Sequence, residues 1–181
     1  MKKIDVEIEG VTPLLMNKYN VQAELDRQKG KRITKTYDPE VEADISAYWG
    51  TGKKKELIIP SEVLYASILN ASSFHKINRR SARSILAGSI NIEPFEISLG
   101  TDKYIIDNRP VVIQRARVIK SRARIDKWKA TFKILYDERL ISDPFIIKTV
   151  LEEAGQRIGI MDFRPQKGGR YGTFKITKFI S

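Results

Sequence analysis

The stretch Gly159-Ile-Met-Asp-Phe-Arg-Pro-Gln-Lys-Gly-Gly-Arg-Tyr-Gly-Thr-Phe174 lies near the end of the 181-residue chain, and the rest of the sequence is organised around it. It has four glycines ahead of a short closing strand, and glycine permits positive φ and close approach of another backbone. Its cationic and aromatic side chains are Arg164, Lys167, Arg170, Phe163 and Tyr171. This composition is typical of a loop that holds a phosphodiester backbone. The alternative is a solvated turn between a helix and a strand.

The segments on both sides of this loop show clear periodicity. Before it, Ser142 or Asp143 is placed to cap a helix that has Pro144 at its first position. Apolar residues at helical spacing predict the buried face of that helix: Ile147, Val150, Leu151, Ala154 and Ile158. After the loop, residues 173–179 predict a strand. At the other end of the chain, strict alternation over residues 3–9 predicts a half-buried first strand.

The clearest strand pair in the middle of the chain is 111–119 with 127–137, joined by a basic connector over 120–126. On the second strand an apolar face consists of Trp128, Ala130, Phe132, Ile134 and Tyr136. Between Arg109 and Lys133 there are nine cationic residues, opposed only by Asp126. This concentration of charge, interleaved with Trp128, Tyr136 and Tyr171, favours binding of a nucleic-acid backbone. The alternative is a solvated face.

The remaining elements are predicted from stop signals and apolar stripes. We expect a helix from Ser61 to about Lys76, a basic connector over 78–83, and a hairpin made by 90–99 and 104–106. Pro94 puts the first strand of that hairpin on an edge or interrupts it. Residues 18–56 form an insertion. It holds a basic loop with one helical turn at 22–28, followed by a helix that Asp38 caps and that runs to about Trp49.

The order strand, helix, strand, strand, helix, strand is the split βαβ arrangement. The predicted fold class is therefore α+β, as one domain over residues 1–181. It has a ferredoxin-like or RNA-recognition-motif-like antiparallel sheet, two packing helices, and inserted loops and a hairpin. Helices on one face would leave the other face open. The aromatic signature with which RNA-recognition modules stack bases on that face is not evident in the sequence.

Composition narrows the class of partner. The formal net charge is +11 with a pI of about 9.8, which favours a polyanion, with nucleic acid ahead of an anionic membrane surface. With no cysteine and only His75, thiolate and histidine-cluster metal sites are excluded and no cofactor is expected. No apolar run reaches membrane-span length and no signal peptide precedes the first strand, so the expected setting is the cytoplasm.

Three segments together resemble the RAMP superfamily, the repeat-associated proteins of CRISPR systems. Ile8-Glu-Gly-Val-Thr-Pro-Leu-Leu15 resembles their opening strand and turn. Ile58-Ile-Pro-Ser-Glu-Val-Leu-Tyr-Ala-Ser-Ile-Leu69 resembles their strand, turn and first helix, without the Gly and Lys common after that turn. Lys167-Gly-Gly-Arg-Tyr-Gly-Thr-Phe174 resembles their glycine-rich motif. The pattern is also similar to small proteins of phage and prophage genomes, which implies a prokaryotic cell and allows a phage- or prophage-encoded origin.

The resemblance implies a modified RNA-recognition fold that binds single-stranded nucleic acid, RNA or DNA, as a homo-oligomer or filament along the strand. It places Ser61 at a helix N-terminus near a phosphate and residues 167–172 along the backbone. Together with the cationic middle of the chain, the expected contact residues are Ser61, Arg115, Arg117, Arg122, Arg124, Lys127, Lys129, Arg164, Lys167, Gly168, Gly169, Arg170 and Tyr171.

Two further functions stay open at this point. The first is a metal-independent endoribonuclease, for which His75 is the one histidine candidate and Tyr65 or Tyr171 a possible partner. A helix-end histidine that contacts a carbonyl is the simpler interpretation. Asp102 and Asp107 could support metal-dependent cleavage, but Asp102 lies in an ordinary turn pattern. The second is a structural subunit whose basic surface contacts an acidic protein partner.

Overall fold

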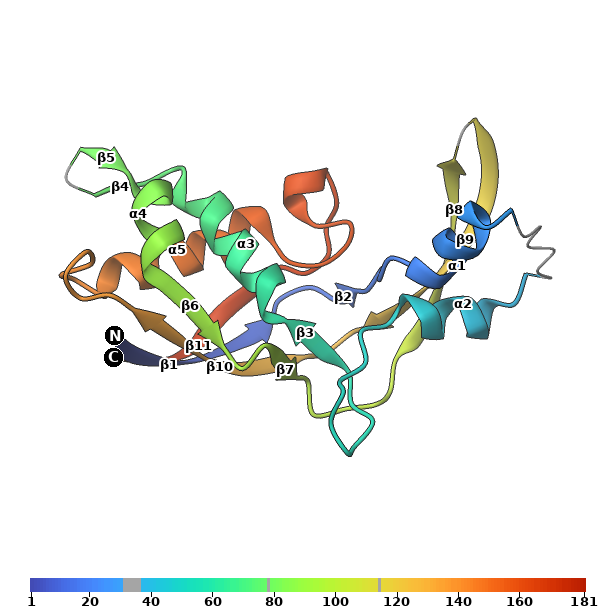
Figure 1. Ribbon diagram of the computed structural model, residues 1–181, viewed down its shortest axis with the longest axis horizontal. Helices are drawn as coiled ribbons and strands as arrows, with labels where there is room; N and C mark the ends of the chain where they lie inside the picture. Colours follow the sequence, from blue (N-terminus) through green and yellow to red (C-terminus); the bar gives the residue numbers. More distant parts are fainter. Residues whose placement is uncertain (31–36, 78, 114) are drawn as a thin grey trace.

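The computed structural model describes residues 1–30, 37–77, 79–113 and 115–181, and it contains a four-stranded antiparallel sheet at its centre (Figure 1). The strands of this sheet are β1 (Lys2–Gly10), β6 (Ile90–Glu93), β10 (Lys129–Tyr136) and β11 (Phe174–Ile180). Their order is β11-β1-β10-β6. The first and third strands of the split βαβ unit thus occupy the middle. The α+β class with an antiparallel sheet is confirmed.

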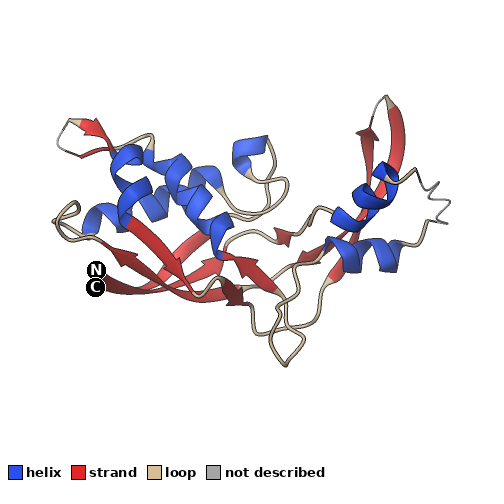
Figure 2. Ribbon diagram, in the orientation of Figure 1, coloured by secondary structure: helices blue, strands red, loops and turns tan. Residues whose placement is uncertain are grey.

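Helices cover one face of this sheet, as Figure 2 shows. They are α3 (Ser61–Ser72), α4 (Ala82–Ser89), α5 (Phe145–Glu153) and the π-helical turn η1 (Ala154–Ile158). The alternation of β1 places Ile4, Val6 and Ile8 in the core, and the predicted apolar faces of β10 and α5 are buried there too. At about 1.5–3 kcal/mol for each buried large aliphatic side chain, this layer supplies the main stabilisation of the fold.

A second body of structure projects from the end of the sheet and is called the arm here. It consists of the hairpin β8 (Ile105–Ile113) with β9 (Ala116–Ile125), and of α1 (Val21–Gln28) and α2 (Pro39–Ser46) beside it (Figure 1). The short strand β2 (Leu14–Leu15) pairs with β9 at the base of the arm. Asp38 caps α2 as predicted, since its side chain accepts a 2.9 Å bond from the backbone N–H of Glu40.

The strand pairing differs from both hairpins that we predicted. Residues 120–125 are not a connector but belong to β9, whose partner is β8, and Asp126 follows the strand. β10 pairs with β1 and β6 instead, so β6 is the second strand of the core unit. The predicted hairpin of 90–99 with 104–106 is also wrong, because β7 (Glu96–Ser98) pairs with β3 (Ile58–Pro60). Alternation identifies a strand and its buried face, but it carries no information about the partner strand.

Two helix boundaries and one element also differ. α3 ends at Ser72 rather than near Lys76, and α2 ends at Ser46 rather than near Trp49. In place of the basic connector the chain forms a small hairpin, β4 (Lys76–Ile77) with β5 (Arg80–Ser81), and then α4. The helical turn predicted at 22–28 is α1. Part of the predicted basic loop, residues 31–36, lies outside the described residues.

Candidate nucleic-acid interface

The glycine-rich loop folds back on itself, and two of its glycines serve that compact shape. A Cβ on Gly169 would overlap the backbone carbonyl of Phe163, and a Cβ on Gly172 would overlap the carbonyl of Ile160. The N–H of Tyr171 donates to the Phe163 carbonyl at 3.0 Å. We expected these glycines to allow close approach of a bound nucleic-acid backbone. Of the glycines in the loop, this holds at most for Gly168, where a Cβ would meet nothing within 4 Å.

The same loop is held against the base of the arm by the chain that follows β1. The N–H of Gly172 donates to the Pro13 carbonyl at 2.8 Å, and the N–H of Asp162 donates to the Leu15 carbonyl at 3.0 Å. Leu15 in turn pairs with Arg124 of β9. Two segments that are far apart in sequence are thereby fixed side by side.

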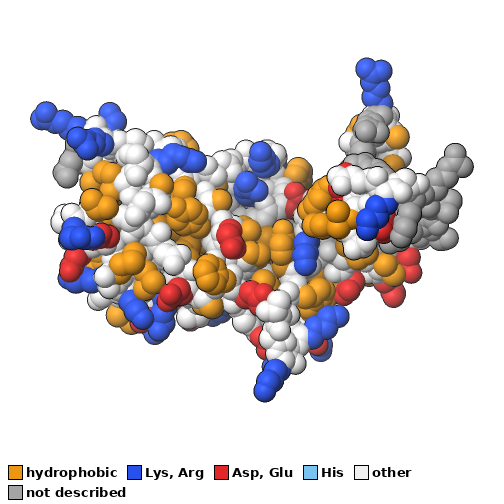
Figure 3. All heavy atoms as spheres, viewed as in Figure 1, with side chains coloured by type: hydrophobic (Ala, Val, Ile, Leu, Met, Phe, Trp, Pro, Cys, Tyr) orange, Lys and Arg blue, Asp and Glu red, His pale blue; other side chains and the backbone are white. Residues whose placement is uncertain are grey.

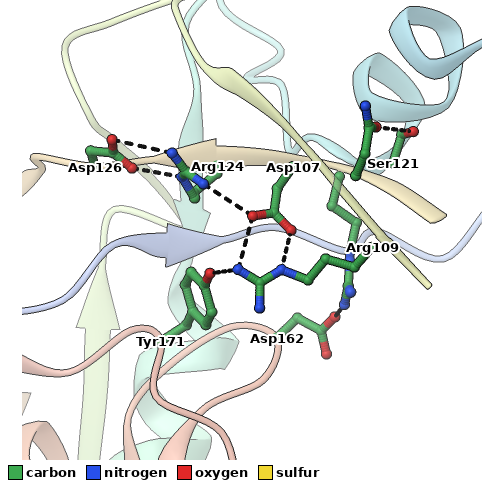
Figure 4. A network of polar contacts seen from close by, with 9 residues as sticks. Asp107, Arg109, Ser121, Arg124, Asp126, Asp162 and Tyr171 are labelled. Atoms are coloured by element: carbon green, nitrogen blue, oxygen red, sulfur yellow. Dashed lines mark hydrogen bonds and ion pairs between the residues drawn. The ribbon is translucent and has the colours of Figure 1, made fainter. Parts of the chain in front are cut away.

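A polar network on the arm faces this loop (Figure 4). Asp107 on β8 is buried and accepts bonds from two arginines: the Arg109 Nε at 2.5 Å and the Arg124 Nη1 at 3.1 Å. Arg124 also donates its Nε to Asp126 at 2.7 Å. Burial opposes ionisation of Asp107, but the bonds from Arg109 and Arg124 outweigh it and lower the pKa of the carboxyl below its ordinary value. Asp107 therefore fixes the position of both guanidinium groups.

Arg109 also contacts Tyr171 of the glycine-rich loop. Its guanidinium donates to the tyrosine hydroxyl and lies over the ring, with 5.0 Å from the guanidinium carbon to the ring centroid. The rings of Tyr171 and Phe163 are 6.1 Å apart between centroids. Tyr171 is thus engaged by protein groups, whereas the Phe163 ring is 43% exposed.

These groups line a cleft of about 480 Å³ between the loop and the base of the arm. Its walls are formed by Thr12, Pro13, Arg109, Arg124, Asp126, Phe163, Gly168, Arg170 and Tyr171. The cleft thus combines three arginines with an exposed aromatic ring, which are groups suited to a phosphate and a base. Asp107 and Asp126 already offset Arg109 and Arg124, so Arg170 carries the least compensated charge of the three.

The predicted contact residues separate by their exposure. Arg115 and Arg117 lie exposed at the tip of the β8–β9 hairpin, away from the cleft. Other exposed positions are Lys127, Lys129, Lys167, Gly168 and Arg170, while Arg124, Arg164, Gly169 and Tyr171 are half-buried. Arg164 is turned inward, since its Nη1 donates to the Met161 carbonyl at 2.9 Å.

Two predicted contact residues lie inside the protein. Arg122 is only 8% exposed and forms an ion pair with Asp162 that joins the arm to the loop. Ser61 is 4% exposed, and its backbone N–H, which the prediction offers to a phosphate, donates to the Phe95 carbonyl at 2.8 Å. Burial therefore removes both residues from the candidate interface. Asp162 thus pairs with Arg122 of the arm rather than with Arg164, two positions along the chain.

Two aromatic residues that seemed interleaved with the basic cluster are also buried. Trp128 and Tyr136 are each 4% exposed. The indole N–H of Trp128 donates to the Thr12 carbonyl at 3.0 Å. Neither ring lies where a base could stack on it, so both are part of the core.

The open face of the sheet is a ladder of paired charges rather than a basic surface. Glu9 lies between Lys129 and Lys175, at 3.8 Å and 3.1 Å, and Lys133 lies 3.9 Å from Asp5. Lysines alternate with the apolar positions of β10, but the acidic positions of β1 compensate their charge. Lys129 is therefore a weaker candidate for backbone contact than Lys167 or Arg170.

Sequence reasoning missed Arg109 as a cleft residue, although a local signal was present. Asp107 and Arg109 are two positions apart on β8, and Arg124 and Asp126 are two positions apart around the end of β9. Residues i and i+2 share a face of a strand. This spacing could have indicated two ion pairs on one face of a hairpin, had the pairing of β8 with β9 been known.

Within the described residues, no hydrogen bond joins the groups that were considered for metal-independent cleavage. His75 Nε2 is buried with no hydrogen-bond partner in the described part of the chain. The Tyr65 hydroxyl donates to the Ala87 carbonyl and the Tyr171 hydroxyl accepts from Arg109. No group of three potential metal ligands occurs among the described residues. In the same part of the chain, none of the helices has the length and apolar character to cross a membrane.

The fold and the cleft define an α+β protein in which an arm and a glycine-rich loop enclose a basic cleft. Neither a protein-family model nor a curated protein matches this sequence. Among solved structures, the chain is similar to a chain in the cryo-EM structure of the Type III-B Cmr-beta bound to cognate target RNA. The TM-score is 0.56 at 15% identity, over 98% of this chain and 59% of that chain. This likeness supports the predicted RAMP-like fold, and the chain spans 59% of the length of its neighbour.

Proposed function

We propose that this chain is a non-catalytic protein that binds single-stranded nucleic acid through its backbone, with RNA as the preferred strand. The observation that carries the proposal is the cleft, which Arg109, Arg124 and Arg170 line together with the exposed Phe163. The net charge of +11 supports it. The solved neighbour belongs to a structure that contains target RNA, which favours RNA over DNA as the partner and membership of the RAMP superfamily as the origin of the fold.

The geometry favours contacts to phosphate with little base reading. Arginine side chains can donate two parallel bonds to a phosphate. The one exposed aromatic ring of the cleft can stack on any base, because every base has a π face. We therefore expect binding that is steeply salt-dependent and weakly sequence-dependent.

A side-by-side oligomer along the strand is the second part of the proposal. It is supported by apolar side chains that the hairpin of the arm leaves exposed, namely Val112, Val118 and Ile119. Light scattering with and without a long strand tests this part. A mass that stays at that of one chain in both conditions would contradict it.

The experiment that tests binding is fluorescence anisotropy of labelled single-stranded RNA, single-stranded DNA and duplex at several salt concentrations. The cleft variant combines Arg170→Gln, which lines the cleft, with Lys167→Gln beside it on the glycine-rich loop. It is compared with Lys53→Gln/Lys178→Gln, which removes the same charge from exposed positions away from that loop and the cleft. We expect single strands to be preferred over duplex. The cleft variant should lose about tenfold in affinity, and the slope of log affinity against log salt should fall by about 0.7 for each phosphate contact that is lost. Equal affinity of the two variants would argue against the cleft.

The ribonuclease and the acidic-partner alternatives are decided by the same samples. End-point strands are run on a denaturing gel, and shortened strands that His75→Ala abolishes would replace the non-catalytic proposal by the ribonuclease. If no strand binds at low salt, the nucleic-acid proposal fails and an acidic protein becomes the expected partner.

A further inference from the structure

A second group of cationic side chains lies at the end of the molecule opposite the arm (Figures 1 and 3). It is carried by the small hairpin β4–β5 and is called the tip cluster here. Its members are Lys76, Arg79 and Arg80, all exposed. Figure 3 shows their end of the molecule as a projection with cationic side chains, separated from the cationic tip of the β8–β9 hairpin by the body of the protein.

The backbone of β4–β5 presents these side chains to solvent. Lys76 pairs with Ser81 and Ile77 with Arg80, so the strands close over only two positions each. Arg79 adopts a positive φ of 67° in the connection, a conformation that is uncommon for a residue with a side chain. The 3.0 Å bond from the N–H of Ala82 to the His75 carbonyl closes the base of the hairpin.

The charges of the tip cluster are uncompensated. Within the described residues, Lys76, Arg79 and Arg80 form no ion pair. The neighbouring cations differ in this respect. Arg83 donates to the Leu69 carbonyl at 2.9 Å, at the end of α3, and Arg157 pairs with Glu153 at 2.6 Å. Among the described residues, the three cluster side chains therefore carry charge that no ion pair compensates.

An exposed aromatic ring lies next to the cluster in sequence. Phe74 is 52% exposed and carries the Arg157 guanidinium over its ring at 4.3 Å from the centroid. Cations beside an exposed aromatic ring are the combination that single-strand-binding surfaces use. Among the described residues of the hairpin, the one apolar side chain is Ile77, which is half-buried and packs against the core, so the hairpin has no exposed apolar centre of the kind found in protein–protein interfaces.

We propose that the tip cluster is a second phosphate-backbone site, separate from the cleft, which engages the same single strand when that strand is long enough to reach both. This inference rests on the proposed function, because the cleft provides the first attachment. Once a strand is held in the cleft, its free part has a high effective concentration at the tip cluster, so the second contact raises affinity without a new partner.

The test compares short and long single-stranded RNA, of about 8 and about 40 nucleotides, since binding modules of this kind cover about 4–16 nucleotides each. The variant Lys76→Gln/Arg79→Gln/Arg80→Gln keeps the long side chains. Its matched control, Lys3→Gln/Lys53→Gln/Lys178→Gln, removes the same charge from exposed positions elsewhere. Circular dichroism and thermal melting establish that each variant is folded, and Arg79→Gln/Arg80→Gln serves if the triple variant is not.

We expect the tip variant to lose about tenfold in affinity for the long strand and about two units of its salt slope, at about 0.7 units for each lost phosphate contact. Its affinity for the short strand should match that of the control. Equal loss on both lengths would overturn the inference, because the tip would then belong to the same site as the cleft.

Other outcomes separate this inference from the proposed function. If the wild-type protein binds long strands and the tip variant binds them equally well, the inference fails and the cleft proposal stands. If the wild-type protein binds no strand, both fail. If labelled polyglutamate binds the wild-type protein but not the tip variant, while RNA affinity is unchanged, the tip cluster is a site for an acidic protein and the inference is overturned.

Discussion

The guanidinium of Arg109 lies over the ring of Tyr171 and donates to its hydroxyl, although the two residues are 62 positions apart in sequence. One comes from the arm and the other from the glycine-rich loop. Asp107 holds the other side of the guanidinium. The contact therefore joins the two walls of the cleft, so that its width depends on a pair of side chains as well as on the backbone.

This relationship predicts energetic coupling between Arg109 and Tyr171. Arg109→Lys keeps the charge but loses the planar fork, and Tyr171→Phe keeps the ring but loses the hydroxyl. We expect the two substitutions to be non-additive by about 1 kcal/mol in the free energy of unfolding, as is usual for residues in contact. Urea denaturation of the two single variants and the double variant measures the coupling. Additive effects would show that the contact does not tie the arm to the loop.

The exposed ring of Phe163 predicts a contribution to binding that comes from stacking. Phe163→Leu keeps apolar volume but removes the aromatic face. We expect about 1 kcal/mol of binding free energy to be lost for single-stranded RNA, at the low end of measured base stacking. The control is Phe145→Leu on α5, a ring that is also exposed but lies outside the cleft. Anisotropy titration would refute the role of Phe163 if both variants bound like the wild type.

The ion pair of Arg122 with Asp162 predicts a loss of stability when its acid is removed. Asp162→Asn leaves the buried guanidinium without a counter-charge. Breaking a fully buried ion pair costs more than this, but the Asp162 side chain is 30% exposed. We therefore expect the free energy of unfolding to fall by about 1–3 kcal/mol. A melting temperature about 2–4 °C lower for each kcal/mol follows for a chain of this size. Asp102→Asn, in an exposed turn, is the matched control, and equal melting temperatures of the two would contradict the prediction.

The lowered pKa of Asp107 predicts how stability depends on pH. An unfolded aspartate titrates near pH 3.9, and the folded carboxyl titrates below that because Arg109 and Arg124 donate to it. The stabilisation is therefore complete above about pH 4 and is lost as the pH falls through the folded pKa. We expect the difference in unfolding free energy between wild type and Asp107→Asn to shrink on acidification. A difference that stays constant from pH 6 to about pH 2.5 would contradict the assignment.

Much of the fold could be predicted because it depends on local periodicity. The alternation in β1 and β10 identified their buried faces, because every second residue of a strand points to the same side. The apolar spacing in α5 identified its buried side, because every third or fourth residue of a helix lies on the same face. The order of elements was sufficient to predict an antiparallel sheet of the split βαβ class, but the prediction gave 111–119 the place beside β10 that β6 occupies. The candidate site was predicted in part, since Lys167, Arg170 and the loop that carries them do line or border the cleft.

What the sequence by itself determined is therefore the position and buried faces of β1, β10 and α5 and the excess of positive charge. Only the tertiary structure decided which charges remain available. The pairing of β1 with β10 and β11 places Glu9 next to Lys129 and Lys175. The packing of the glycine-rich loop on the arm places Asp162 next to Arg122. The physical reason is that periodicity is a property of neighbouring residues, whereas compensation of a charge depends on which distant segment lies within a few ångströms. Among the described residues, our two proposals therefore place the contact with a polyanion at the cleft and at the tip cluster.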